Sequence, residues 1–389
     1  MNDMASYEID PARALPAIAY RDQGAYDSEL HRIWQGGWVF VGTADQVAQP
    51  GDYFTAFLGG QPIIVLRNQT GELAALSNMC AHRGTLLVDE PGNTKRFQCP
   101  YHAWTYRDDG GLLSVPHAKA DQVDKGVHCL PSYRCESWHG LVFASMNPDV
   151  EPLAQRFAHL ESIAAEHRIG ELHHWTSQRE TQEWNANWKL VISNAMESYH
   201  LFRVHPETLE PYTPTADAYY IVGNADGTAT GGTQKGEDDY VLLSLPPNFV
   251  GVISGGSFLY QYIEPIAVDQ TRIVAAGAFE YDDPERSSKI AGLLSKATQR
   301  VTESLIPDFL PEDKWICERG QLAASGNFEP GVIIPMEHVI TDFHHYLNRQ
   351  LHGAATPPVA TSETVGIPGP RRPGNNLQLL YNLQLRYNL

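Results

Sequence analysis

The spacing of apolar residues changes several times along the chain, and each change marks an expected element. In residues 26–36, Leu30, Ile33 and Trp34 recur at helical spacing, which predicts a helix. The apolar residues that follow form short runs rich in β-branched and aromatic side chains and bounded by Gly, Pro, Asn or Asp, as is typical of strands. These runs are residues 38–44, 61–68, 72–78 and 140–147. A small all-β domain is therefore expected after one helix.

A helical period returns beyond residue 150, where two helices are followed by a run of strands and then by three more helices. The helices are expected at 151–169, 186–202, 284–305, 312–325 and 335–352. The strands are expected at 247–254, 257–264 and 271–281. Because sheet strands and long helices share one unit, the second domain is predicted to be α+β. Residues 223–239 are rich in Gly, Thr and Asp and are expected to form a mobile loop at a pocket mouth.

These patterns divide the chain into four segments. We expect an N-terminal helical segment over 1–37, an all-β domain over 38–150 and an α+β domain over 151–355. The remaining residues, 356–389, begin with a Pro/Gly/Ser/Thr-rich stretch and are predicted to be a disordered tail.

Composition narrows the function classes. The formal net charge of −18 argues against nucleic acid or an anionic membrane as the main partner, because either would require a basic face. The N-terminus lacks a basic segment followed by a long apolar core, and no apolar run is long enough to span a bilayer. The five cysteines show no disulfide-framework spacing, which favours a reducing cytoplasm.

Two short stretches carry the first candidate chemistry. Cys80 and His82 lie in one, and Cys99 and His102 lie in the other, with sixteen residues between His82 and Cys99. Each stretch offers one sulfur and one nitrogen, whereas a zinc finger groups two Cys and then two His. The alternating order suits a [2Fe-2S] cluster in which one iron takes both Cys and the other takes both His. Zinc remains the alternative for these four residues.

A second group of candidate ligands lies in the predicted helix 186–202 and just beyond it. Glu197 and His200 are three residues apart and would share a helix face. His205 is five residues beyond His200, so both imidazoles can reach one metal only if the helix ends or bends between them. Pro206 supplies a reason, because the residue before a proline is disfavoured in the helical region. Two His and one carboxylate would make the facial triad of non-haem Fe(II) oxygenases.

Together these motifs resemble the Rieske non-haem iron oxygenases, specifically their catalytic α subunits, over roughly residues 26–352. The resemblance rests on Cys80-Ala81-His82-Arg83-Gly84, on Cys99-Pro100-Tyr101-His102 with Trp104, and on Asn187-Trp188-Lys189, Asn194, Glu197, His200 and His205. It implies a small Rieske domain followed by a helix-grip catalytic domain, in which a long helix packs on an antiparallel sheet. It also implies a [2Fe-2S] cluster and a mononuclear Fe(II).

The resemblance further assigns roles to individual residues. It makes His200 and His205 iron ligands and places a carboxylate ligand in the stretch 311–318, where Asp313 is the choice and Glu312, Glu318 and Asp308 are competitors. It makes Asn194 and Glu197 catalytic residues. The acid at the Glu197 position bridges a cluster-ligating His of one subunit and an iron-ligating His of its neighbour. Most members carry Asp there, and Glu is similar to the carnitine and glycine betaine oxygenases.

Partners and reaction follow from the same resemblance. A homotrimer is expected, with or without a small second subunit. NAD(P)H electrons would arrive through a separate reductase and possibly a ferredoxin, because no dinucleotide fingerprint follows a strand. The reaction would use O₂ on a small molecule, with monooxygenation of a polar or quaternary-amine compound favoured over aromatic ring dihydroxylation. Tyr219, Tyr220, Phe258, Tyr260 and Tyr262 are candidate pocket residues. The remote alternatives are a Rieske electron carrier without catalysis and a zinc-stabilised binding module.

Overall fold

The computed structural model forms two compact units, each described here by itself. One unit is Glu29–Arg156, and the other combines the segment up to Ser28 with the chain from Phe157 onward. This division falls inside the predicted N-terminal helical segment. The described residues are 7–119, 121–174, 180–233, 239–254, 257–280 and 309–366.

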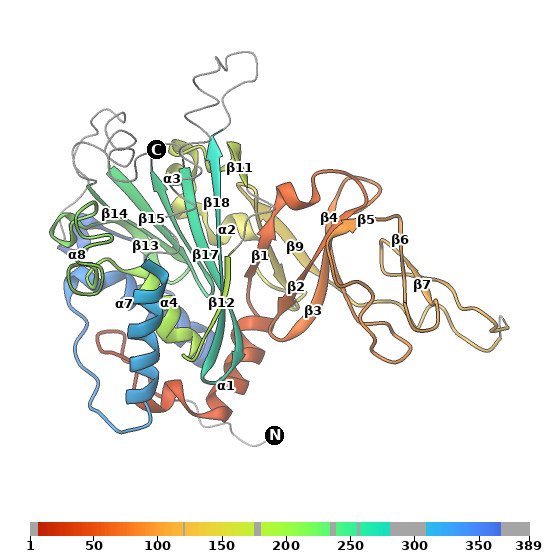
Figure 1. Ribbon diagram of the computed structural model, residues 1–389, viewed down its shortest axis with the longest axis horizontal. Coiled ribbons are helices and arrows are strands. Elements are labelled where there is room, and N and C mark those ends of the chain that lie inside the picture. The colour runs from red at the N-terminus through yellow and green to blue at the C-terminus, as the bar shows by residue number, and fades with distance from the viewer. Residues whose placement is uncertain are drawn as a thin grey trace, which may run out of the picture. The chain divides into compact units, whose positions relative to one another are not determined.

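The unit Glu29–Arg156 is built on antiparallel strands (Figure 1). The larger sheet has the order β1-β10-β9-β4-β3-β2-β5. Its strands are β1 (Val39–Thr43), β2 (Asp52–Leu58), β3 (Gln61–Arg67), β4 (Leu73–Ser77), β5 (Gly92–Asn93), β9 (Ser132–Trp138) and β10 (Leu141–Ser145). The smaller sheet contains β6 (Arg96–Gln98), β7 (Thr105–Arg107) and β8 (Leu112–Ser114). The four predicted strands are confirmed as β1, β3, β4 and β10, whereas β2 and the strands β5 to β9 were not predicted.

The predicted helix over 26–36 is confirmed with a change of geometry. Helix α1 (Gln23–Glu29) continues as a π-helical segment, η2 (Leu30–Gln35), which buries Ile33 and Trp34.

The second unit contains a nine-stranded sheet (Figure 1). Its order is β11-β18-β17-β16-β15-β14-β13-β19, and β12 pairs with β18. The strands are β11 (Leu172–His174), β12 (Glu180–Trp184), β13 (Tyr219–Asn224), β14 (Gly227–Thr233), β15 (Asp239–Leu245), β16 (Phe249–Ser254), β17 (Ser257–Ala267), β18 (Gln270–Glu280) and β19 (Ala360–Thr361). The three predicted strands are confirmed as β16, β17 and β18.

The mobile loop predicted over 223–239 is wrong for its described part, which forms strands of the sheet. Two of its glycines, Gly231 and Gly232, leave space for tyrosine rings that pack against the strand. A Cβ on Gly231 would lie 2.9 Å from the ring of Tyr219, and one on Gly232 would lie 2.7 Å from the ring of Tyr240. Glycine in a strand commonly marks such a close approach. Residues 234–238 lie outside the described residues.

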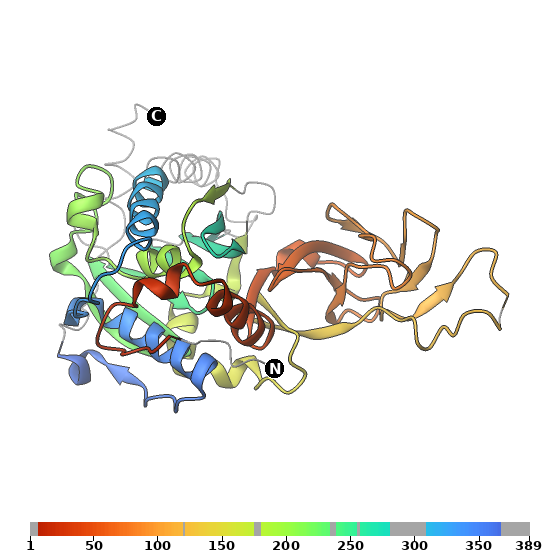
Figure 2. The same ribbon diagram turned by 90° about the horizontal axis from the view of Figure 1, so that it is seen from below.

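Two helices cover one face of this sheet. Helix α4 (Trp188–Met196) packs against β15 to β18, α7 (His338–His352) packs against β13 and β14, and the two helices contact each other. The first described residues run along α7, where Asn348 donates to the carbonyl of Ile9 at 2.9 Å (Figure 2). The predicted helix 335–352 is confirmed as η7 (Pro335–Glu337) and α7.

The other predicted helices differ in their bounds. The predicted helix 312–325 is helical over 309–323. The one predicted over 151–169 is divided into α2 (Leu153–Arg156), η4 (Ala158–Leu160), α3 (Glu161–Glu166) and η5 (Ile169–Glu171), and Arg168 adopts a left-handed conformation before η5. The helix predicted over 284–305 lies outside the described residues. No helix of the described part has both the length and the apolar character needed to cross a membrane.

The predicted disordered tail is wrong in its first part. Residues 360–361 form β19, which pairs with β13 through Val222 and Gly223, and α8 (Ser362–Val365) follows. The pairing covers the open edge of β13, which explains why this Pro/Thr-rich segment is ordered. Residues 367–389 lie outside the described residues.

Candidate metal centres

The two Cys/His stretches adopt the same backbone shape. In each loop the cysteine N–H donates to the carbonyl five residues later, at 2.9 Å from Cys80 and 2.8 Å from Cys99. Each cysteine carbonyl then accepts from the N–H four residues later, at 2.9 and 3.0 Å. That fourth residue is left-handed in both loops, with φ of 74° at Gly84 and 56° at Ala103. Two similar loops therefore present one cysteine and one histidine each.

The two candidate cysteine ligands of these loops are buried, and the two candidate histidine ligands are exposed. Cys80 and Cys99 are each 3% exposed, whereas His82 and His102 are exposed and their ring centroids lie 4.9 Å apart. Among the described residues these four do not bring three ligand atoms within 4.8 Å of one another, as ligands of one tetrahedral ion would. Buried sulfurs and exposed imidazoles instead fit a cluster with one inner and one outer iron.

Aromatic groups surround this candidate centre. The hydroxyl of Tyr106 lies 3.1 Å from the Cys80 sulfur and accepts the Ala81 N–H at 3.1 Å, a position from which it can donate its own proton to a metal-bound thiolate. Burial and the bond to Cys80 raise the pKa of Tyr106, which keeps the phenol protonated as a donor. Trp104 stacks on His82 with centroids 4.7 Å apart. Within the part of the chain that the structure describes, these contacts orient a sulfur and an imidazole without a carboxylate.

The second candidate centre begins where α4 ends. Asn187 caps α4 by accepting the Lys189 N–H at 3.0 Å, and the helix stops at Met196. The predicted continuation to residue 202 is wrong, because Glu197 is extended (φ −120°, ψ 159°). Its carboxylate accepts the N–H groups of Tyr199 and His200 and so stabilises the turn that precedes the next helix, α5 (Leu201–Val204).

Helix α5 places the two histidines at its two ends. His200 is its N-cap and His205 its C-cap, and the non-helical conformation of His205 agrees with the effect expected of Pro206. The imidazole ring centroids lie 5.2 Å apart. The two rings can therefore face one point although they are five residues apart.

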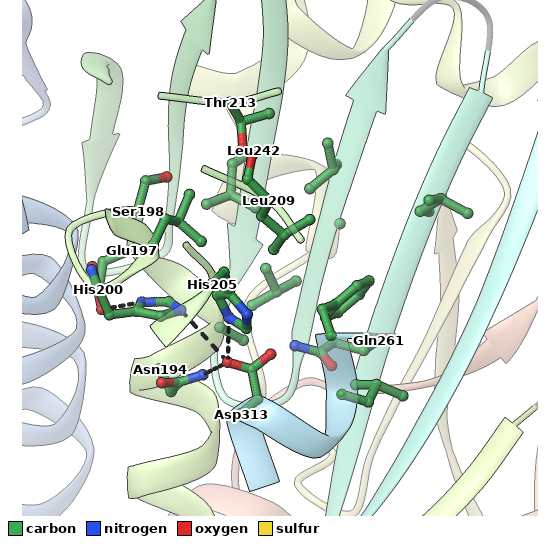
Figure 3. A pocket seen from close by; sticks show the side chains of 18 of the residues that line it. Asn194, Glu197, Ser198, His200, His205, Leu209, Thr213, Leu242, Gln261 and Asp313 are labelled. Carbon is green, nitrogen blue, oxygen red and sulfur yellow. Dashed lines mark hydrogen bonds and ion pairs between the residues drawn. The ribbon is translucent and has the colours of Figure 1, made fainter. Parts of the chain in front are cut away.

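Asp313, from the helix 309–323, lies at that point (Figure 3). Its Oδ1 is 2.9 Å from Nε2 of His205 and 3.5 Å from Nε2 of His200. His205 is fully buried and Asp313 is 6% exposed. Ligand atoms of the three residues all lie within 4.8 Å of one another, the arrangement required to hold a single metal ion.

Each histidine uses its other ring nitrogen to contact a carboxylate. Nδ1 of His200 lies 2.6 Å from Oε1 of Glu197, and Nδ1 of His205 lies 2.6 Å from Oε2 of Glu312. Such contacts fix the tautomer and leave Nε2 free to bind a metal. Asn194 donates to Oδ1 of Asp313 at 2.6 Å. This side of the site thus orients all three candidate ligands.

The two described alternatives to Asp313 as the carboxylate ligand, Glu312 and Glu318, contact other groups. Glu312 contacts the far nitrogen of His205 and also accepts from Thr208 at 2.6 Å. Glu318 accepts from the backbone N–H of Asn185 at 3.0 Å. Asp308 lies outside the described residues. The supporting contact of Glu312 was not predicted, and its only signal in the sequence was the adjacent acidic pair at the start of a helix.

The charges at this centre favour a cation. Burial alone lowers the pKa of His200, but its bonds to Asp313 and Glu197 outweigh burial and raise the pKa to about 9. Burial raises the pKa of Asp313, but the neighbouring imidazoles of His200 and His205 outweigh burial and lower it. Three carboxylates thus converge on two imidazoles, a balance that a divalent ion can complete.

A cavity of about 240 Å³ opens beside the three candidate ligands (Figure 3). Its described walls are largely aliphatic, with Leu242, Val252 and Leu259 contributed by the sheet. No Lys or Arg lines it among the described residues. Its described polar side chains, apart from the residues of the centre itself, are Ser198, Thr208, Tyr212, Thr213, Tyr240, Tyr260 and Gln261.

The predicted aromatic pocket residues are only partly placed on this cavity. Tyr260 lines it, but Phe258 and Tyr262 do not. Phe258 and Tyr262 alternate with Leu259 and Gln261 along β17, so these two aromatic residues stand on the opposite face of the sheet from Leu259 and Gln261. Tyr219 and Tyr220 line a separate small cavity. Tyr212 and Tyr240 border the main cavity and were not predicted.

Comparison with protein families matches both units. A family model described as the Rieske [2Fe-2S] domain matches residues 37–134. A second, described as the ring hydroxylating alpha subunit (catalytic domain), matches residues 169–353. Each match contains one of the two candidate centres described above, and together the matches cover more than half of the chain.

Curated relatives include both monooxygenases and dioxygenases. The chain is 32% identical over 198 residues to the 2-halobenzoate 1,2-dioxygenase large subunit of Burkholderia cepacia, covering 48% of this chain and 42% of the relative. It is 32% identical over 197 residues to the glycine betaine monooxygenase oxygenase subunit of Chromohalobacter salexigens, covering 50% and 44%. The chain spans about half the length of the curated relatives it matches.

Solved structures agree on the fold. A quaternary ammonium Rieske monooxygenase, studied for carnitine oxidation by gut microbiota and inter-subunit electron transfer, matches with a TM-score of 0.77 at 23% identity, covering 88% of this chain and 97% of that one. Naphthalene 1,2-dioxygenase from a Rhodococcus species, bound to indole, matches with a TM-score of 0.71 at 19% identity, covering 87% and 93%. At such identities the likeness shows the fold alone.

Proposed function

The chain belongs to the catalytic α subunits of the Rieske non-haem iron oxygenases, and from this membership we propose that it uses O₂ to hydroxylate or oxidatively dealkylate a small organic substrate. The observation that carries the proposal is the convergence of His200, His205 and Asp313 beside a 240 Å³ cavity. A facial set of two His and one carboxylate leaves other coordination positions open, as oxygenase chemistry requires.

We assign the cofactors to residues as follows. Cys80, His82, Cys99 and His102 would hold the Rieske [2Fe-2S] cluster, and His200, His205 and Asp313 would hold the mononuclear iron. When bound, the cluster supplies electrons one at a time, and the iron supplies the place where O₂ is activated.

The remaining residues of the site orient the three candidate ligands and form the walls of the cavity. Glu197 and Glu312 accept the Nδ1 protons of the two histidines and so keep Nε2 directed at the metal position. Asn194 holds Asp313 by its Oδ1. The aliphatic walls exclude water from the reacting carbon of the substrate.

The cluster and iron centre that cooperate are proposed to belong to different subunits of a homotrimer, with Glu197 bridging them. The resemblance carries this proposal, and a solved relative is described in terms of inter-subunit electron transfer. Electrons would come from NAD(P)H through a separate reductase, possibly with a ferredoxin. A cytoplasmic location agrees with five cysteines that are all free of disulfides.

Co-assembly of two inactive variants tests this arrangement. Cys80→Ser removes a cluster ligand and His205→Ala removes an iron ligand, so each homo-oligomer should be inactive. Mixed oligomers would regain turnover if an intact cluster serves the iron of a neighbour. A mixed assembly that stays inactive, in oligomers shown to contain both variants, would overturn the inter-subunit path.

The substrate is proposed to be polar and neutral, cationic or zwitterionic. Glu197, Glu312 and Asp313 make the region around the metal acidic, and no Lys or Arg lines the described walls to pair with an anion. Glycine betaine and carnitine monooxygenase subunits among the relatives agree with this class. The second candidate is an aromatic ring-hydroxylating dioxygenase, which the aliphatic walls and the 2-halobenzoate 1,2-dioxygenase relative favour.

Two measurements test the function. The reduced protein should show the absorption and EPR spectrum of a Rieske cluster, and a colourless, EPR-silent protein would leave a zinc-stabilised module as the better interpretation. Turnover should then be assayed across quaternary amines and aromatic acids with a generic reductase. Oxygenation of a quaternary amine supports the proposal, whereas preferential formation of an arene cis-diol would replace it with the dioxygenase.

A further inference from the structure

The wall of the main cavity carries one polar side chain among aliphatic neighbours. Gln261 lies on β17, opposite Val250 of β16 and Ala275 of β18 in the sheet register. All three residues line the cavity. Figure 3 shows the Gln261 side chain reaching into the cavity on the side of Asp313. An aliphatic residue would fill this position of the wall without requiring a hydrogen bond.

Gln261 is also the polar residue of the described wall that has no partner. Ser198 contacts the hydroxyl of Tyr240, Thr208 donates to Glu312, and Thr213 donates to the carbonyl of Leu209. Within the described chain Gln261 makes no side-chain hydrogen bond, ion pair or ring contact. A partly buried amide without partners loses hydrogen bonds that only water or a ligand can restore.

The hydrogen-bond donors on the cavity wall indicate which acceptor group a ligand would carry. Four described lining side chains carry N–H groups, namely Asn194, His200, His205 and Gln261. The first three each have a carboxylate partner: Asn194 contacts Asp313, His200 contacts Glu197 and His205 contacts Glu312. Among these four side chains Gln261 is therefore the one whose N–H groups have no partner within the described chain, and a carbonyl or carboxylate oxygen of a ligand can accept from it.

We propose that Gln261 determines substrate specificity by donating from its side-chain amide to an oxygen of the substrate, which carries no net negative charge. This inference rests on the proposed function and names the substrate class of the same site: neutral carbonyl compounds and zwitterions. In a zwitterion the carboxylate accepts from Gln261 while the cationic group faces the acidic centre. The bond thereby sets which carbon faces His200, His205 and Asp313.

The test compares ligands that differ in one oxygen-bearing group. Glycine betaine is paired with tetramethylammonium, and benzamide is paired with toluene. Binding to the metal-loaded oligomer is measured by calorimetry under argon without reductant, so no turnover is needed. Wild type should bind the oxygen-bearing member of at least one pair about tenfold more tightly, the usual effect of one hydrogen bond.

Three variants make the comparison specific. Gln261→Leu should abolish the preference while leaving the oxygen-free member bound within about twofold. Gln261→Glu should bind glycine betaine still more weakly, because the new carboxylate repels the carboxylate of this ligand. It should bind tetramethylammonium more tightly, because this cation is attracted to the new charge and has no carboxylate. Leu259→Met, two residues away on the same face, should affect both members of a pair equally. Circular dichroism and thermal unfolding confirm that each variant is folded.

The outcomes are decisive in both directions. A preference that survives in Gln261→Leu, or a wild type that shows no preference in either pair, would overturn the inference. The EPR spectrum and iron content of the same preparations show whether the proposed function stands. Preparations with both metals but no effect of Gln261 refute the specificity role alone, whereas preparations without them refute the proposed function.

Discussion

The candidate cluster centre and the candidate iron centre differ in how their ligand residues are held in place. The candidate cluster ligands come from two nearby loops, within residues 80–102, that repeat one backbone shape. The candidate iron ligands come from the two ends of α5 and from a helix whose Asp313 is 108 residues beyond His205. Local backbone bonds build the first centre, and long-range side-chain bonds build the second.

The two centres also differ in what supports the ligands. At the cluster, Tyr106 directs a neutral hydroxyl at a sulfur and Trp104 stacks on an imidazole. At the iron, Glu197 and Glu312 each accept from an imidazole, and both bonds are charge-assisted. A centre supported by carboxylates should be more sensitive to single substitutions than one supported by backbone geometry. Four substitutions test this comparison.

The largest effect is expected for Asp313→Ala. It removes a candidate ligand, so the mononuclear iron and turnover should both be lost. This loss should exceed the roughly 10–100-fold decrease in metal affinity or activity that follows removal of a group that only supports a ligand. The cluster spectrum should be unchanged, because all four cluster ligands lie in Glu29–Arg156. Iron content and EPR are the measurements. Glu318→Gln is the control, since Glu318 bonds Asn185 instead of the centre, and retained iron in Asp313→Ala would assign the ligand elsewhere.

Glu197→Gln should lower turnover by about 100-fold while both metals stay bound. The oxygen of the amide can still accept the N–H groups of Tyr199 and His200, but the side chain no longer provides the charged acceptor for Nδ1 of His200. Stopped-flow oxidation of the pre-reduced cluster by O₂ and substrate should slow in proportion. If the cluster reoxidises at the wild-type rate, the bridging role of Glu197 is wrong.

Glu312→Gln makes the matched change at the other histidine. We expect iron affinity to fall by about tenfold, because the Glu312 carboxylate is more exposed than that of Glu197 and its bond to His205 is better screened. Competition with a chelator measures the affinity. At saturating iron the cluster should reoxidise normally, in contrast to Glu197→Gln. Equal kinetic defects in both variants would show that the two carboxylates have one role.

The smallest effect is expected for Tyr106→Phe. Loss of the hydroxyl removes a hydrogen bond to the Cys80 sulfur, so the reduction potential should fall by an amount worth about 1 kcal/mol. A redox titration followed by EPR measures it. Tyr101→Phe is the control, because within the described residues its hydroxyl makes no hydrogen bond. A potential unchanged in Tyr106→Phe would mean that this bond does not tune the cluster.

Much of the fold was predictable from residue patterns. Strands with continuous apolar runs, such as β3 and β10, and the amphipathic helix α7 were identified because local spacing determines which face is buried. The glycine-rich strand β14 was not, because only the tertiary structure shows the Tyr219 and Tyr240 rings that occupy the space left by Gly231 and Gly232.

For the sites, the sequence by itself determined the residue types and their short-range order. The Cys/His spacing, the His200 to His205 interval and the acidic pair at 312–313 name the candidates. Only the tertiary structure decided which acid faces both Nε2 atoms, that Glu312 contacts the far nitrogen of His205, and that Gln261 reaches the cavity. These outcomes depend on strand register and helix packing between residues far apart in the chain, and short-range sequence patterns carry no information about such pairings.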